Sequence, residues 1–153
     1  MVKYNESIIY KICCRDTEIK EIYIGSTTNF TRRKCEHKYL CNNPTSNKHH
    51  LKVYQFIRDH GSWENWDMVL VETVSCETKL ELHKIERKYI EENNSTLNGC
   101  IPSRTDKEYT KQYREKNREK LKEKIKCSCG SVVRKTDIIR HQKTEKHIKS
   151  LTV

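Results

Sequence analysis

A short stretch near the start of the chain places two anion-binding side chains on one face of a predicted helix. Residues 22–37 read IYIGSTTNFTRRKCEH, an apolar strand, a turn through Gly25, and then a segment with helical spacing. Arg33 and His37 stand four residues apart there, so a guanidinium and an imidazole lie one turn from each other. The planar, permanently charged guanidinium matches phosphate oxygens. The pair therefore indicates an anion site, and the alternative for Arg33 is a surface salt bridge.

A carboxylate occupies a helix position where an apolar residue is expected. In the helix predicted over residues 78–92, the core-facing stripe consists of Leu82, Ile85, Glu86 and Tyr89. A carboxylate there is costly unless it is paired, hydrogen-bonded or metal-bound. Glu86 suits a hard cation such as Mg²⁺, and since residues 1–102 show no acidic cluster with two-metal spacing, a single ion is favoured. The alternative is an edge glutamate paired with a Lys or Arg.

Two strand tyrosines, Tyr10 and Tyr23, could supply a general base or a hydroxyl that positions water. Lowering the pKa of a tyrosine from about 10 to 7 requires roughly 4 kcal/mol of differential stabilisation. His37 or a metal-bound water is the obvious source of that help. From the residues alone, either tyrosine is more often a half-buried sheet residue than a catalyst.

The end of the chain carries a possible zinc site. Cys127, Cys129, His141 and His147 supply two thiols and two imidazoles, which can bind Zn²⁺ tetrahedrally. The Cys-x-Cys spacing lacks one residue of the common turn, so Gly130 is expected to help bring the sulfurs together. The two histidines are six residues apart, so a helix between them must tighten or break. The alternative is a metal-free basic tail.

Several elements must position these side chains. Strands are predicted at 7–13 and 20–24, joined as a hairpin, and at 67–72, whose continuous apolar centre suggests burial on both faces. Helices are predicted at about 29–40, 48–60 and 78–92, and strong helix formers continue through 104–126.

The order of these motifs resembles the GIY-YIG nuclease family. The resemblance rests on Ile8-Ile9-Tyr10, on Tyr23-Ile24-Gly25, on the Phe30-x-x-Arg33-x-x-x-His37 pattern, on Glu86-Arg87-Lys88-Tyr89-Ile90 and on Leu97-Asn98. These motifs span roughly residues 7–100. One departure is visible, because Ile8 stands where the family usually has the glycine of GIY.

The resemblance implies a fold, a reaction and roles. The fold is α/β, a small three-stranded antiparallel sheet flanked by helices, followed here by a charged helix and a zinc-finger-like module. The reaction is hydrolysis of DNA phosphodiesters with one Mg²⁺ or Mn²⁺ ion. By resemblance, Tyr10 is the base and His37 relays its proton, while Tyr23 and Arg33 hold the phosphate. Glu86 binds the metal and Asn98 completes the site.

Charge is concentrated in the last third of the chain. Residues 1–102 hold 15 basic and 14 acidic side chains, whereas residues 103–153 hold 16 and 7. A net charge of +9 there predicts binding to nucleic acid rather than to a membrane, because no amphipathic apolar face accompanies it. The predicted phosphate contacts are Arg114, Arg118, Lys122, Arg134, Lys135, Arg140 and Lys143.

We therefore expect three regions: a nuclease domain at 1–102, a basic helical linker at 103–126 and a two-Cys/two-His finger at 127–153. The linker is equally a charged spacer or a helix that follows DNA phosphates. Most of the eight cysteines are expected to be reduced. The N-terminus lacks a signal peptide, so the protein is expected to be soluble and intracellular, with DNA as partner and no small-molecule cofactor.

The leading hypothesis is a DNA endonuclease similar to homing nucleases or to virus- or phage-encoded family members. A structure-specific repair nuclease differs from it only in substrate. The alternative that is not an enzyme is a decayed, non-catalytic GIY-YIG fold that binds nucleic acid. The Ile8 departure is its only support.

Overall fold

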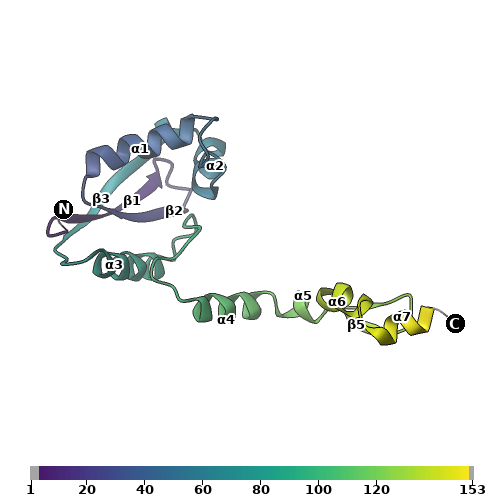
Figure 1. The fold of residues 1–153 in the computed structure, drawn as a ribbon. Helices are drawn as coiled ribbons and strands as arrows, with labels where there is room; N and C mark the ends of the chain where they lie inside the picture. The colour runs from purple at the N-terminus through teal and green to yellow at the C-terminus, as the bar shows by residue number, and fades with distance from the viewer. Residues whose placement is uncertain (1–3, 152–153) are drawn as a thin grey trace. The chain divides into compact units, whose positions relative to one another are not determined.

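A computed structural model describes residues 4–151 and divides the chain into two compact units, residues 1–103 and 104–153 (Figure 1). The chain ends 1–3 and 152–153, which belong to the first and last predicted regions, lie outside the described residues. None of the described helices is long and apolar enough to cross a membrane.

The first unit is built on a three-stranded antiparallel sheet, as predicted. β1 (Ser7–Cys14) is the central strand, with β2 (Ile22–Thr27) on one side and β3 (Trp66–Val74) on the other. Tyr10 pairs with Gly25 across the β1–β2 ladder. Because side chains alternate along a strand, β1 supplies residues to both faces of the sheet.

Two helices, α1 (Phe30–Asn42) and α2 (Lys52–Asp59), pack against the sheet face that carries Tyr10 (Figure 1). Asn29 begins α1 because its side chain accepts a hydrogen bond from the Arg32 amide at 2.9 Å. The 3₁₀ helix η1 (Trp63–Asn65) leads from α2 into β3. The buried core on this face consists of Tyr10, Ile12, Cys41, Val53, Tyr54, Ile57, Trp63, Trp66, Met68 and Leu97.

The helix α3 (Lys79–Glu92) packs on the opposite face of the sheet (Figure 1). Thr78 begins it by accepting a hydrogen bond from the Glu81 amide. The buried core on this side is smaller and consists of Ile9, Ile24, Cys76, Leu82 and Ile90. The two cores hold β1 between them, so its residues are fixed from both sides.

Two elements of this unit differ from the prediction. β3 is not buried on both faces, since Val69, Leu70 and Val71 are 39%, 50% and 38% exposed. The reason is that β3 is an edge strand of the sheet, which an apolar run alone does not reveal. The second helix begins at Lys52 rather than near residue 48, and Leu51 before it is exposed.

The second unit is a chain of short elements rather than one long helix. These are α4 (Asp106–Lys116), α5 (Arg118–Lys122), β4 (Lys124–Lys126), β5 (Val132–Arg134), the 3₁₀ helix η2 (Lys135–Asp137), α6 (Ile138–Gln142) and α7 (Glu145–Leu151). The prediction of helix through residue 126 is therefore wrong in two places. Asn117 ends α4, and residues 124–126 pair with β5 in a hairpin.

Gly25 in β2 faces the ring of Tyr10 at very short range. A Cβ at this position would lie 2.5 Å from the Tyr10 hydroxyl oxygen and 2.6 Å from Cζ. The only atom that fits there is hydrogen, so the glycine is required for space rather than for an unusual backbone angle. Gly99 differs, because a Cβ there would meet nothing within 4 Å.

We predict that Gly25→Ala displaces Tyr10 and lowers the free energy of unfolding by about 1–3 kcal/mol, the usual cost of overpacking. Urea unfolding followed by tryptophan fluorescence measures this, since Trp63 and Trp66 both lie in the first unit. Gly99→Ala is the matched control and should be near neutral. Equal stability of the two variants would contradict the prediction.

Candidate active site and metal cluster

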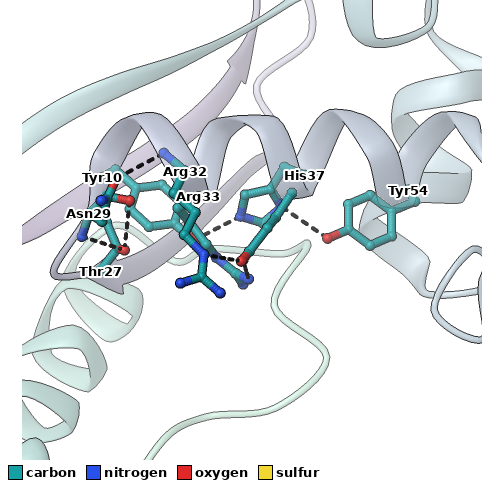
Figure 2. A network of polar contacts seen from close by, with 8 residues as sticks. Tyr10, Thr27, Asn29, Arg32, Arg33, His37 and Tyr54 are labelled. Atoms are coloured by element: carbon teal, nitrogen blue, oxygen red, sulfur yellow. Dashed lines mark hydrogen bonds and ion pairs between the residues drawn. The ribbon is translucent and has the colours of Figure 1, made fainter. Parts of the chain in front are cut away.

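The hydroxyl of Tyr10 is the centre of a buried polar network (Figure 2). It accepts a hydrogen bond from Nε of Arg33 at 3.0 Å and lies 2.8 Å from Nε2 of His37. Both partners come from α1, where their spacing places them on the face toward the sheet. The predicted pairing of Arg33 with His37 thus exists, and the side chain they share is a tyrosine.

His37 is completely enclosed between tyrosines and a tryptophan. Its Nδ1 lies 2.9 Å from the hydroxyl of Tyr54 on α2, and its ring stacks on Trp63 with an interplanar angle of 9°. Burial, reinforced by the charge of Arg33, lowers the pKa of His37 to about 3. The imidazole is therefore neutral at ordinary pH, donating from one nitrogen and accepting at the other.

Arg33 joins this network to the surface. Its Nη1 donates to Oε2 of Glu36 at 3.1 Å, and the charge of the guanidinium also acts on Tyr23. Burial disfavours the charge of Arg33, but the oxygens of Tyr10, Glu36 and Tyr23 outweigh it and raise the pKa. For Tyr10 and Tyr23, burial has the opposite effect and raises the pKa, because it disfavours the charged phenolate. Both are therefore protonated phenols at neutral pH.

A cleft of about 520 Å³ opens beside the edge of β2. It brings together four of the predicted site residues, which are Tyr23, Arg33, Glu86 and Asn98. Tyr10 and His37 lie behind it, with 0% and 1% exposure. The cleft therefore contains the predicted cation and the predicted carboxylate, together with Lys48 and Lys52, and the tyrosine–histidine pair lies in the core behind it.

Glu86 reaches the cleft from α3. The hydroxyl of Ser26 on β2 donates to its Oε2 at 2.5 Å. Burial raises the pKa of Glu86, while the Ser26 bonds and the charges of His83 and Arg33 act in the opposite direction. A carboxylate has about four lone-pair sites, so a bond from Ser26 leaves room for a metal. The oxygen donor set fits a hard divalent cation.

Asn98 is held on the backbone of β2. Its Nδ2 donates to the carbonyl of Ile24 at 2.7 Å, and its Oδ1 accepts from the amide of the same residue at 2.9 Å. The Ser95 hydroxyl, with its single proton, lies 2.5 Å from this Oδ1 and 2.7 Å from the carbonyl oxygen of Ile22. Asn98 thus covers the edge of β2 as a neighbouring strand would, and it fixes the loop that forms one wall of the cleft.

Sequence reasoning missed several polar residues of this site, among them Lys48 and Lys52, which line the cleft. Tyr54 holds His37, Ser26 holds Glu86, and His83 lines the cleft three residues before Glu86 on the same helix. The spacing of His83 from Glu86 was a usable signal, because residues three apart share a helix face. Tyr54 gave no such signal, since its partner lies 17 positions away.

A comparison with models of protein families identifies the family of the first unit. Residues 6–99 match the GIY-YIG catalytic domain. The chain belongs to the GIY-YIG family. No curated protein and no solved structure gives a significant match.

Membership in the GIY-YIG family implies a nuclease that acts on DNA, and GIY-YIG nucleases use divalent metals. The family glycine replaced by Ile8 lies on β1, where the isoleucine side chain is half-buried and packs against the larger core. Tyr10, two residues further on the same face, keeps its full set of contacts. An isoleucine at position 8 is therefore compatible with the network.

The second unit gathers the four predicted zinc ligands. Their candidate ligand atoms all lie within 4.8 Å of one another. Sγ of Cys127 is 3.5 Å from Nδ1 of His147, Sγ of Cys129 is 3.1 Å from Nε2 of His141, and the two nitrogens are 3.3 Å apart. A tetrahedral zinc ion with ordinary bond lengths requires sulfur–nitrogen edges of about 3.6 Å and nitrogen–nitrogen edges of about 3.3 Å.

Two local features shape this cluster as the sequence predicted. Gly130 has a φ of +85°, which lets the chain turn tightly after Cys129 into β5. The helix between the histidines breaks, because α6 ends at Gln142 and α7 begins at Glu145. Hydrogen bonds from Ser131 and His141 lower the pKa of Cys129 to about 5, which favours the thiolate that binds metals.

Three of the side chains predicted to contact phosphate form ion pairs with carboxylates of the second unit. Arg134 and Arg140 both pair with Asp137, and Lys135 pairs with Glu123. These are surface pairs worth about 1 kcal/mol or less, so a phosphate can replace the carboxylate. The other four, Arg114, Arg118, Lys122 and Lys143, make no ion pair with the described residues.

The depressed pKa of His37 predicts a pH-dependent part of stability. On acidification, an unfolded His37 takes up a proton near pH 6.5, whereas the folded one does so only near pH 3. The unfolded state therefore binds more protons in this window, and stability falls by about 2 kcal/mol between about pH 7 and pH 5. Urea unfolding at these pH values should show that His37→Gln lacks this part. Parallel losses in both proteins would contradict the assignment, because the remaining histidines are common to them.

Proposed function

We propose that the chain is a metal-dependent DNA endonuclease that hydrolyses phosphodiesters in the cleft beside β2. The observation that carries this is the placement of Arg33 and Glu86 in one cleft, with Tyr10 and His37 joined directly behind Arg33. A cation for the phosphate, a carboxylate for the metal and a path for a proton are thus close together.

In this proposal Arg33 and Tyr23 hold the scissile phosphate. The guanidinium provides two-pronged hydrogen bonding and stabilises charge that develops on the phosphoryl oxygens. Tyr23 lines the cleft together with Arg33, whose charge acts on the Tyr23 phenol. A Mg²⁺ or Mn²⁺ ion held by Glu86 would polarise the phosphate and the leaving oxygen.

Tyr10 and His37 form the proton path. Tyr10 is a phenol at neutral pH, so it can accept a proton from water only after its own proton moves to Nε2 of His37, 2.8 Å away. The charge of Arg33 favours loss of that proton, because it lowers the pKa of Tyr10 against the effect of burial. Tyr54, bonded to Nδ1, keeps the imidazole aligned for the transfer.

Asn98 serves this site as a positioning residue. The side-chain amide of Asn98 makes its hydrogen bonds with the backbone of Ile24 on β2. Asn98 therefore holds the wall of the cleft against the strand that carries Tyr23. A decayed, purely DNA-binding fold stands as the opposite outcome of the experiment below.

Cleavage of supercoiled plasmid and of branched DNA with Mg²⁺ or Mn²⁺ tests the nuclease. Glu86→Ala should lower the cleavage rate by about 100-fold or more, the usual effect of removing a group that stabilises transition-state charge. Glu92→Ala is the matched control, since Glu92 is an exposed carboxylate on the same helix. Binding without cutting on every substrate would establish the decayed fold, and full activity of Glu86→Ala would remove Glu86 from the mechanism.

We also propose that the Cys/His cluster binds one Zn²⁺ ion and that the basic tail adds DNA affinity through phosphate contacts. The gathering of the four ligand atoms within 4.8 Å of one another supports a single ion, and the Cys127–His147 and His147–His141 separations of 3.5 Å and 3.3 Å are close to tetrahedral edges. Zinc would hold a unit whose own apolar core is very small, as in other metal-dependent folds.

Elemental analysis of the purified chain should give one zinc per molecule, lost in Cys127→Ser and kept in the control Cys100→Ser, whose thiol is exposed in the first unit. A chelator should remove secondary structure from the second unit while leaving tryptophan fluorescence unchanged, because Trp63 and Trp66 lie in the first. Retention of zinc by Cys127→Ser would refute the proposed site.

A further inference from the structure

Two tyrosines on α4 present their rings to solvent. Tyr109 is 57% exposed and Tyr113 is 49% exposed, one turn further along the helix. Their rings are nearly parallel, with an interplanar angle of 20° and centroids 6.4 Å apart. The described part of the second unit therefore leaves a pair of aligned aromatic faces open, although each ring would gain free energy from being covered.

A guanidinium extends this surface. Arg104 lies over the ring of Tyr109, with Cζ 5.2 Å from the centroid, which is within the range of a cation–π contact. The same guanidinium donates a hydrogen bond to Gln112, so its plane is held in place. The guanidinium and the two rings form what we call the Tyr109–Tyr113 platform.

The platform belongs to a strongly basic segment. Residues 104–126 contain 10 basic and 5 acidic side chains, a net charge of +5. Lys107, Lys111 and Arg114 lie along a different stripe of α4 from the tyrosines, where they line a shallow groove together with Asp106 and Glu115. The helix thus offers flat aromatic surface on one side and charges for a phosphate backbone on another.

We infer that the Tyr109–Tyr113 platform stacks unpaired bases of DNA, so that the preferred substrate contains a single-stranded segment such as a flap or a branch. This rests on the proposed function for its choice of DNA as ligand. Proteins hold single strands by stacking bases on aromatic rings and contacting the backbone with basic residues, and here Arg104 is the basic group beside the rings. Bases in an intact duplex already stack on their neighbours and offer no free face to the rings.

The test measures binding of the full, zinc-loaded chain to labelled DNA by fluorescence anisotropy, in a Glu86→Ala background to prevent cutting. One probe is a blunt duplex, and the other is the same duplex with a single-stranded flap. The Tyr109→Ala/Tyr113→Ala variant should bind the flapped probe about tenfold or more weakly and the duplex unchanged. Its salt dependence should stay the same, because no charge is removed.

Two control variants separate stacking from other effects. Tyr109→Phe/Tyr113→Phe keeps both rings and should bind the flapped probe as the parent does. Tyr39→Ala removes a tyrosine that is 60% exposed in the first unit and should have no effect on either probe. In addition, 5-iododeoxyuridine placed in the flap should photo-crosslink to peptides that contain Tyr109 or Tyr113.

Equal weakening of both probes by the alanine variant would overturn the inference and make α4 a duplex-binding helix. No weakening of either probe would also overturn it and mean that the rings cover another part of this protein. The outcome is independent of the nuclease proposal, which is measured by cutting in the chain with Glu86 intact. Stacking without cutting would leave the inference standing and reject the nuclease, and cutting without stacking would do the reverse.

Discussion

The hydroxyl of a tyrosine in the middle of a central strand has to find partners away from water. A buried polar group left without a hydrogen bond costs about 1–3 kcal/mol, and Tyr10 avoids this through Arg33 and His37. That requirement fixes how α1 lies on the sheet, because both partners must point inward one turn apart. It also requires the absence of a side chain at Gly25, and it brings α2 into the network through Tyr54. The hydrogen bonds and the close packing around this hydroxyl therefore link β1, β2, α1 and α2.

The same burial separates the charges that the site needs. His37 is kept neutral by desolvation and by the charge of Arg33, so no second positive charge stands beside Arg33 at neutral pH. Arg33 stays charged because phenol and carboxylate oxygens surround it. Glu86 approaches from the other core, held by Ser26 at the edge of β2. Opposite charges therefore meet in the cleft although they belong to helices on opposite faces of the sheet, and the edge strand between them makes this possible.

The sequence predicts those features that depend on spacing within one element. Arg33 and His37 share a helix face, the strand residues alternate between two cores, and a six-residue gap between histidines requires a broken helix. Features that depend on which elements become neighbours were not predictable in this way. The exposure of Leu70 follows from the place of β3 in the sheet. The hydrogen bond between Asn98 and Ile24 on β2 joins residues that are 74 positions apart in the sequence. The strand at residues 124–126 is likewise a consequence of its pairing with β5, which overrides strong local helix propensity.

The net charge differs strongly between the two units. With a net charge of +1, the first unit as a whole has little long-range attraction for DNA, and its positive charge is local, where Arg33, Lys48 and Lys52 line the cleft beside Glu86. The last third of the chain carries +9 and can supply that attraction, although part of it is offset by Asp137 and Glu123. Phosphate contacts of this kind give affinity without sequence information. Selectivity must then come from groups that recognise something other than charge, and the exposed aromatic faces of α4 are the uncharged surface best suited to that role.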